Sequence, residues 1–171
     1  MIRANLSNEY TLDQLRNAED FLSRIDEICY SLVKLRREYS ALITSSGPKG
    51  YVCQSVECGP HKSTCGISAE LLTQRISELS SRYQQLYDLL CLLKQDLKKI
   101  SKTKEFMLLY LRFKKGLNAA ETTARMNSSV RNYYRIRQRA LYPVCESLLK
   151  TELGRKVLQN GSSAVLHRYF R

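Results

Sequence analysis

The chain has 171 residues, which is enough for one or two small domains with a hydrophobic core. Hydrophobic residues make up 43% and charged residues 26%, ordinary proportions for a globular protein that exclude a collagen-like chain. The longest apolar runs, such as residues 89–93, are far shorter than the about 20 residues of a membrane-spanning helix. The N-terminal residues lack the apolar stretch of a signal peptide, so we expect a cytosolic protein rather than a secreted disulfide scaffold.

Positive charge is concentrated in the C-terminal part of the chain. Residues 1–100 contain 13 Lys and Arg against 12 Asp and Glu, whereas residues 101–171 contain 15 against 4. Almost all of the net charge of +12 therefore lies after residue 100. A basic field of this kind attracts polyanions, of which nucleic acid is the commonest in the cytosol. The alternatives are a solvated basic face and an acidic protein partner.

Two segments of the N-terminal half have the period of long helices with one apolar face. The first runs from Thr11 to Ile43 and the second from Ser68 to Ile100, each about 50 Å long as a helix. The second has the more regular series, Leu72, Ile76, Leu79, Tyr83, Leu86, Leu90, Leu93, Leu97 and Ile100. Their equal length on either side of one connection predicts an antiparallel helical hairpin, a coiled coil. A coiled coil between two copies would satisfy the same pattern, so a homodimer through the hairpin stays open.

Four potential metal ligands lie in the connection, residues 44–67. Cys53, Cys58, His61 and Cys65 have the spacing C-x4-C-x2-H-x3-C. Three thiolates and one imidazole suit tetrahedral Zn²⁺, and binding would order this loop. The order Cys-Cys-His-Cys is that of a zinc knuckle, whereas the spacing differs from the usual C-x2-C-x4-H-x4-C. The ligand set thus fits Zn²⁺ and the spacing does not, which makes Zn²⁺ a candidate cofactor; the alternative is a loop with reduced thiols or a disulfide, without a cofactor.

Local signals after residue 100 predict a series of shorter helices. The first covers 104–115 and ends at Gly116, after two lysines that suit a helix C-terminus. Asn118 and Glu121 then form a capping-box pair at the start of a helix over 119–125.

A tight turn at 126–128 separates that short helix from another. We expect Ser128 to cap a helix over 129–142, which Pro143 interrupts because the residue before a proline avoids the helical region. Small residues at Ala120 and Ala124 predict close packing of the short helix. The expected core of this part is Leu117, Met126, Val130, Tyr133, Ile136 and Ala140.

A short helix, a tight turn and a second helix make a helix-turn-helix, and here the second helix is rich in arginine. In the major groove of DNA, Arg pairs with guanine edges and Asn with adenine. Residues near the N-terminus of such a helix reach bases, and later ones reach phosphates. We therefore expect Ser129, Arg131, Asn132 and Arg135 to face bases, Arg125, Arg137 and Arg139 to face phosphates, and Ser128 at the turn to join this DNA-binding set.

Three stretches of this part resemble the region-4-like domains of sigma factors. Residues 106–118, FMLLYLRFKKGLN, are similar to their opening LRY-x-x-G-x-s. Residues 123–128, TARMNS, resemble the IA-x-x-L-x-x-S core, and residues 139–141, RAL, resemble the R-A-L near the end of the recognition helix. A long helical hairpin in front of such a domain resembles the phage late-gene transcription regulators of the RinA and ArpU type.

The expected organisation is thus an all-α fold in three parts. Residues 1–100 form the hairpin with its Cys- and His-containing loop, 101–150 the sigma region-4-like helix-turn-helix domain, and 151–171 a basic C-terminal extension. The resemblance implies a phage or prophage activator that binds double-stranded promoter DNA in the cytoplasm of a bacterial host. By analogy with region 4, it also implies contact with host RNA polymerase.

Two other functions fit the same sequence features. A phage DNA-packaging protein of the small-terminase type also combines helix-turn-helix and coiled-coil elements, and a coiled-coil adaptor without a DNA role would use its basic half on an acidic protein. We find none of the motifs GxxxxGK[ST], GxGxxG, HExxH or GxSxG, and only two histidines, His61 and His167. The sequence therefore does not predict an enzyme.

Overall fold

The structure, a computed structural model, describes residues 10–45 and 69–170. Their regular elements follow in the order α1 (Leu12–Ser23), α2 (Ile25–Ser45), α3 (Ala69–Lys99), α4 (Lys104–Leu109), η1 (Tyr110–Lys114), α5 (Ala119–Arg125), α6 (Val130–Leu149), α7 (Glu152–Asn160) and α8 (Ser162–Phe170). All of these elements are helical, η1 being a turn of π-helix, so the predicted all-α class is confirmed.

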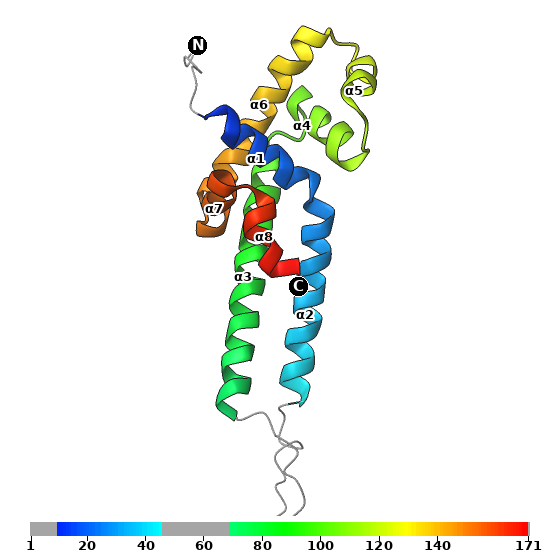
Figure 1. The fold of residues 1–171 in the computed structure, drawn as a ribbon. Coiled ribbons are helices and arrows are strands. Elements are labelled where there is room, and N and C mark those ends of the chain that lie inside the picture. The colour runs from blue at the N-terminus through cyan, green and yellow to red at the C-terminus, as the bar shows by residue number, and fades with distance from the viewer. Residues whose placement is uncertain (1–9, 46–68, 171) are drawn as a thin grey trace, which may run out of the picture.

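Helices α2 and α3 pack side by side, run in opposite directions and project from the rest of the molecule (Figure 1). Helix α3 covers nearly the same residues as the second predicted segment. Its buried leucines, Leu79, Leu86, Leu89 and Leu93, join the main hydrophobic core together with Ile28 and Leu35 of α2. The apolar seam of this pair is therefore filled within one chain.

The prediction of one continuous helix from Thr11 to Ile43 is wrong, because the chain turns at Arg24 between α1 and α2. The Arg24 N–H bonds back to the carbonyls of Phe21 and Leu22, which closes α1 with a tighter turn. Helix α1 then packs against α6 and α7 rather than α3. The three-four spacing of apolar residues specifies a buried face but not the helix that covers it. The pattern therefore continues across the bend at Arg24 without a visible change.

The prediction that Pro143 interrupts a helix is also wrong, because Pro143 lies inside α6. Proline removes one backbone hydrogen bond and crowds the preceding turn. Burial of the following turns favours continuation, since Val144, Cys145 and Leu148 are fully buried in the main core. Burial also raises the pKa of the Cys145 thiol to about 12, which keeps this thiol protonated.

Helix α6 joins two separate groups of buried side chains. Near its start, Tyr133 and Ile136 pack with Leu108 of α4 in a small cluster that Ala119 and Met126 partly cover. From Ala140 onward, its buried residues belong to the main core with α1, α2, α3, α7 and α8. One helix thus connects the small cluster next to α4 and α5 with the main core (Figure 1).

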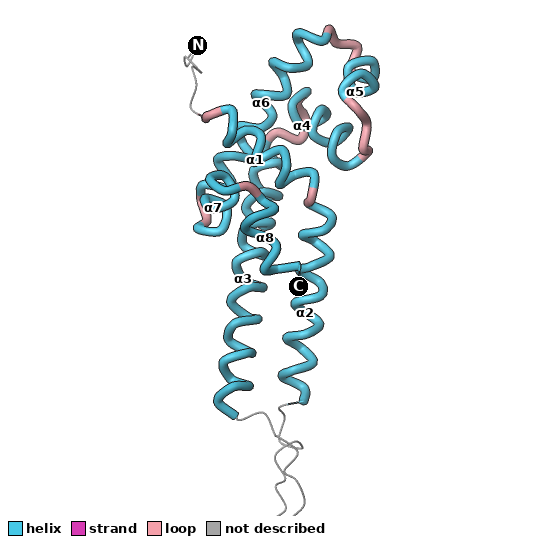
Figure 2. Tube along the Cα trace, in the orientation of Figure 1, coloured by secondary structure: helices cyan, strands magenta, loops and turns pink. Residues whose placement is uncertain are grey.

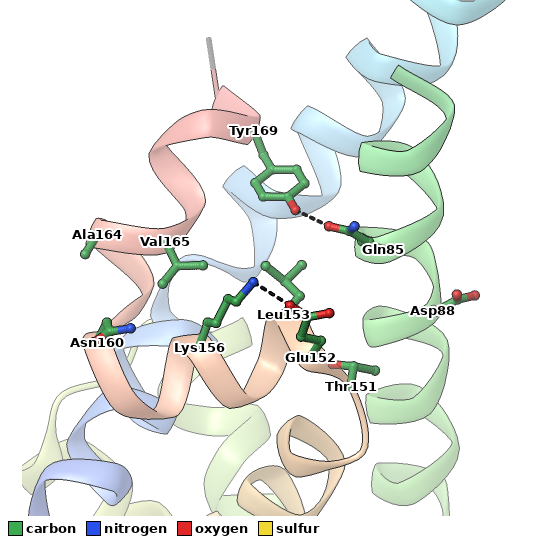
Figure 3. A pocket seen from close by; sticks show the side chains of 10 residues that line it. All are labelled: Gln85, Asp88, Thr151, Glu152, Leu153, Lys156, Asn160, Ala164, Val165 and Tyr169. Atoms are coloured by element: carbon green, nitrogen blue, oxygen red, sulfur yellow. Dashed lines mark hydrogen bonds and ion pairs between the residues drawn. The ribbon is translucent and has the colours of Figure 1, made fainter. Parts of the chain in front are cut away.

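The last two helices fold back onto α1 and α3. The Asn17 side chain of α1 donates to the Leu158 carbonyl at 2.8 Å, and Ser162 donates to Asp20. On the other side, the Tyr169 hydroxyl donates to Gln85 of α3 at 2.5 Å, across a hollow where Lys156 bonds Glu152 at 2.6 Å (Figure 3). The buried Leu153, Val157, Leu158 and Leu166 make the segment after residue 151 part of the main core.

A buried carboxylate connects α3 to α6. Asp96 is 6% exposed and accepts hydrogen bonds from Ser147 at 2.8 Å, from Lys99 at 2.6 Å and from Lys150. The hydrogen bonds from Lys150 and Lys99 hold the pKa of Asp96 well below its usual range. Because both cations lie at its oxygens, this charge is satisfied despite its burial.

We expect Gly154→Ala to destabilise the fold. A Cβ at Gly154 would lie 2.1 Å from the Leu148 carbonyl oxygen, a backbone atom that cannot swing away. We expect a loss of about 1–3 kcal/mol in the free energy of unfolding, as for other overpacked sites, measured by urea denaturation. The control Gln159→Ala, at an exposed position of the same helix, should change it by less than about 0.5 kcal/mol. A gain in stability, as helical Gly→Ala ordinarily gives, would contradict this close contact.

Replacing the buried carboxylate should show its effect on stability and on the pH dependence. Asp96→Asn should lower the free energy of unfolding at pH 7 by about 1–3 kcal/mol, since two ammonium groups lose their anionic acceptor. The folded-state pKa is lowered, so the carboxylate stabilises above the unfolded pKa of about 4, and its contribution is lost as the pH falls below that value. The difference between wild type and variant should therefore shrink below about pH 4 in urea titrations at several pH values. Asp88→Asn, an exposed position of the same helix, should show no such difference.

Candidate nucleic-acid interface

Local capping signals fix the short helix α5. The Asn118 side chain accepts from the Glu121 N–H at 2.9 Å, and Glu121 accepts from the Asn118 N–H at 2.8 Å, which is the predicted capping box. Before it, Gly116 has φ +68°, a left-handed conformation that ends η1 at low cost for glycine. The Arg112 guanidinium donates to the Leu117 carbonyl at 2.9 Å and so holds the connection.

The turn between α5 and α6 is closed by two backbone hydrogen bonds. The Ser128 N–H bonds to the Thr123 carbonyl at 3.1 Å and the Asn127 N–H to the Ala124 carbonyl at 3.1 Å. Asn127 has φ +46°, so this is a Schellman turn with asparagine in the left-handed position (the short pink segment between α5 and α6 in Figure 2). Because Ser128 is used in this turn, the cap of α6 is Ser129, whose hydroxyl accepts from the Asn132 N–H at 3.3 Å; the prediction of Ser128 as the cap is wrong.

The face that α5 buries differs from the predicted one. Thr122 is fully buried and donates to the Asn118 carbonyl at 2.8 Å, whereas Ala120 and Ala124 are exposed. Tyr133, Ile136 and Ala140 of α6 are buried as predicted, but Val130 is 64% exposed. The inner face of α5 thus consists of Ala119, Thr122 and Thr123, and the apolar pattern does not indicate the two threonines.

A continuous stripe of exposed side chains runs along the first half of α6, and we call it the outer face of α6. Its members are Val130, Arg131, Tyr134, Arg135, Gln138 and Arg139. The spacing i, i+1, i+4, i+5, i+8, i+9 keeps them on one side of the helix. Because no acidic residue lies between 129 and 142, this face is positively charged.

Tyr134 is a member of this surface that is not among the residues predicted to bind DNA. It is 56% exposed and lies between Arg131 and Arg135 along the helix. Together with Ser129, Arg131, Asn132, Arg135 and Gln138 it lines a shallow hollow on this side of α6. An exposed aromatic ring among arginines was the available signal, but the helical period alone did not show on which side Tyr134 lies.

The polar residues at the start of α6 form a hydrogen-bonded chain. The Asn132 Nδ2 donates to the Ser128 hydroxyl at 2.8 Å, and its Oδ1 accepts from the Arg135 guanidinium at 2.8 Å. Asn132 and Ser128 are half-buried, whereas Ser129, Arg131 and Arg135 are exposed. The structure therefore brings together all five candidates of the turn and the first two turns of α6.

Arg137 lies on a different side of α6 and is held by α1. Its guanidinium donates through Nε to Glu19 Oε1 at 3.0 Å and through Nη2 to Glu19 Oε2, a two-point ion pair. The hydrogen bond to Glu19 raises the pKa of Arg137, and both residues are half-buried. Unlike Arg137, Arg139 is exposed on the outer face, and Arg125 is exposed at the end of α5.

Helix α1 also adds a basic residue near this surface. Leu12, Leu15 and Arg16 line one side of a groove whose other side is made by Tyr134, Arg137, Gln138 and Leu141 of α6. Arg16 has an exposed side chain, 3.6 Å from Asp13. The sequence could not indicate this neighbour, because the break after α1 had to be known first.

The four predicted zinc ligands, Cys53, Cys58, His61 and Cys65, lie outside the described residues. Within residues 10–45 and 69–170, no group of three or more His, Cys, Asp or Glu side chains is arranged to hold a metal ion. None of the helices in these two ranges combines the length and apolar character that crossing a bilayer requires. Comparison with protein-family models, curated protein sequences and solved structures finds no match to this chain.

Two arginines of α6 that are only two positions apart should behave differently on substitution. Arg137→Gln should lower the free energy of unfolding by about 1–3 kcal/mol, because it leaves the largely buried Glu19 carboxylate without its partner. Arg139→Gln should change it by less than about 0.5 kcal/mol, since Arg139 is exposed. Urea unfolding of the two variants measures both values. Equal effects would contradict a structural role for the Arg137–Glu19 pair.

Proposed function

We propose that this chain is a sequence-specific DNA-binding regulator of transcription that inserts the first half of α6 into the major groove of promoter DNA. The observation that carries the proposal is the outer face of α6, an exposed stripe with three arginines and no carboxylate that follows the tight turn after α5. The stripe from Val130 to Arg139 is about 15 Å long, and a major groove about 12 Å wide admits an α-helix.

The packing of α6 supports this way of binding. Its second half is buried in the main core and α1 crosses its middle at the Arg137–Glu19 pair, so the free part is the N-terminal half. This is the part of a recognition helix that usually reaches base edges. In the proposed complex, Arg131 and Arg135 face bases, whereas Arg125 and Arg139 at the two ends of the surface face phosphates.

The biological setting is that of the phage late-gene activators that the sequence resembles. The proposed partners are double-stranded DNA, host RNA polymerase and a second copy of the chain, in the cytoplasm of a bacterial cell. Since the seam between α2 and α3 is filled within one chain, a homodimer would use the outer surface of this pair. Zn²⁺ bound by Cys53, Cys58, His61 and Cys65 remains part of the proposal.

Removing the two base-facing arginines should abolish specific recognition without unfolding the chain. A preferred site is first selected with the wild-type chain from a pool of randomised duplexes. Arg131→Ala/Arg135→Ala should then bind that site about 30-fold or more weaker, because each Arg–guanine pair contributes about 1–3 kcal/mol of discrimination. Fluorescence anisotropy at near-physiological salt, with random duplex as competitor, measures this loss.

Arg36→Ala/Arg37→Ala is the matched control for this variant. It removes the same charge from an exposed pair on α2, a helix that lies apart from the first half of α6 (Figure 1), and should leave the preference for the selected site unchanged. An equal loss for the selected and the random duplex in the α6 variant would mean that these arginines contact only phosphates. Assembly of the chain into a ring would favour the small-terminase alternative, and the absence of any DNA binding would favour the adaptor.

A further inference from the structure

We propose that Arg135 reads a guanine and that Asn132 is the positioning residue that holds the Arg135 guanidinium, instead of reading an adenine itself. The inference rests on the proposed function, because it assigns a base to one side chain of the same surface. It differs from what the residue types suggest, since asparagine on a recognition helix ordinarily pairs with adenine.

The hydrogen bonds of Asn132 carry this assignment. Its Nδ2 donates to the half-buried Ser128 hydroxyl and its Oδ1 accepts from Arg135 Nη2, each at 2.8 Å. To pair with adenine, an asparagine must present both of these atoms on one free edge, as acceptor and donor together. Here the two atoms connect the turn to the next turn of α6, so the amide lies along the helix instead of pointing away from it.

The guanidinium of Arg135 retains the donors that guanine requires. Arginine has five N–H donors, of which Asn132 engages one, and two parallel donors match the N7 and O6 acceptors of guanine. Orienting this flexible side chain before binding reduces the rotamer entropy that complex formation would otherwise remove. A held arginine is thus a better reader of one base than an unrestrained one.

Arg131 offers the internal comparison. It lies one turn earlier on the same exposed face, and within the described part of the chain no hydrogen bond or ion pair is found for its guanidinium. Both arginines therefore bring the same charge to the DNA, but only Arg135 is held by a neighbouring side chain. The two should differ in discrimination more than in their contribution to overall affinity.

The test replaces single guanines of the selected site by 7-deazaguanine, which lacks the N7 acceptor and keeps Watson–Crick pairing. At one guanine, we expect this change to weaken binding of the full-length wild type about fivefold or more. The same change should weaken DNA binding by Arg135→Ala less than about twofold, because this variant already lacks the contact to N7. Arg131→Ala should show the same fold-loss of affinity at this guanine as the wild type. Far-UV circular dichroism and thermal melting of each variant check the fold.

Three further variants separate positioning from direct reading. Asn132→Ala should reduce the fold-loss of affinity that 7-deazaguanine causes at that same guanine. Ser128→Ala should reduce this fold-loss less, since it removes only the hydrogen bond from Asn132 to Ser128. Asn132→Asp should restore the wild-type fold-loss at this guanine, because its carboxylate accepts from both the Ser128 hydroxyl and Arg135. Its overall affinity should nevertheless fall, since a negative charge is added close to the phosphates.

The outcomes keep this inference apart from the proposed function. An unchanged 7-deazaguanine effect in Arg135→Ala at every guanine, or an Asn132→Ala variant that loses preference at an adenine instead, would overturn the inference and leave sequence-specific binding intact. A selection that enriches no sequence would overturn the proposed function, and the inference with it.

Discussion

The arrangement of this molecule depends on α6 remaining one helix through Pro143. An internal proline costs about 3 kcal/mol in an isolated helix, and here the apolar surface buried on both sides of it offsets that cost. Before the proline, Tyr133 and Ile136 pack against Leu108 of α4; after it, Val144 and Leu148 pack in the main core. A bend at this position would separate the arginine-rich end from the rest of the protein.

Two polar contacts restrain α6 at different points along its length. Glu19 of α1 holds Arg137 near the middle of the helix, and Asp96 of α3 binds Ser147 and Lys150 near its end. Both carboxylates are largely buried and hydrogen-bonded, so either contact requires its helices to keep their relative placement. The exposed half of α6 is therefore presented on a rigid support, which lowers the entropy that binding a partner would remove.

The sequence predicted best those features that depend on neighbouring residues. The capping box of Asn118 and Glu121 and the stop at Gly116 were predicted because each is encoded within a few positions. The break at Arg24 and the helical Pro143 were not, because both are decided by contacts between distant segments. The cap of α6 was misplaced by one residue, since Ser128 and Ser129 are chemically equivalent and only the backbone bond from Ser128 to Thr123 distinguishes them.

The same division applies to the arginines of α6. The sequence contains four arginines from Arg131 to Arg139, but the charge available to a binding partner depends on which of them form ion pairs within the protein. Arg137 and Arg139 differ by two positions, about 200° around a helix, and this rotation turns one toward Glu19 and the other toward solvent. The amide of Asn132 is likewise engaged by its neighbours Ser128 and Arg135, so it affects the exposed surface by holding the Arg135 guanidinium. Charge alone thus indicates a polyanion, whereas the pairing of each side chain decides which donors and acceptors remain free for the base contacts that we propose.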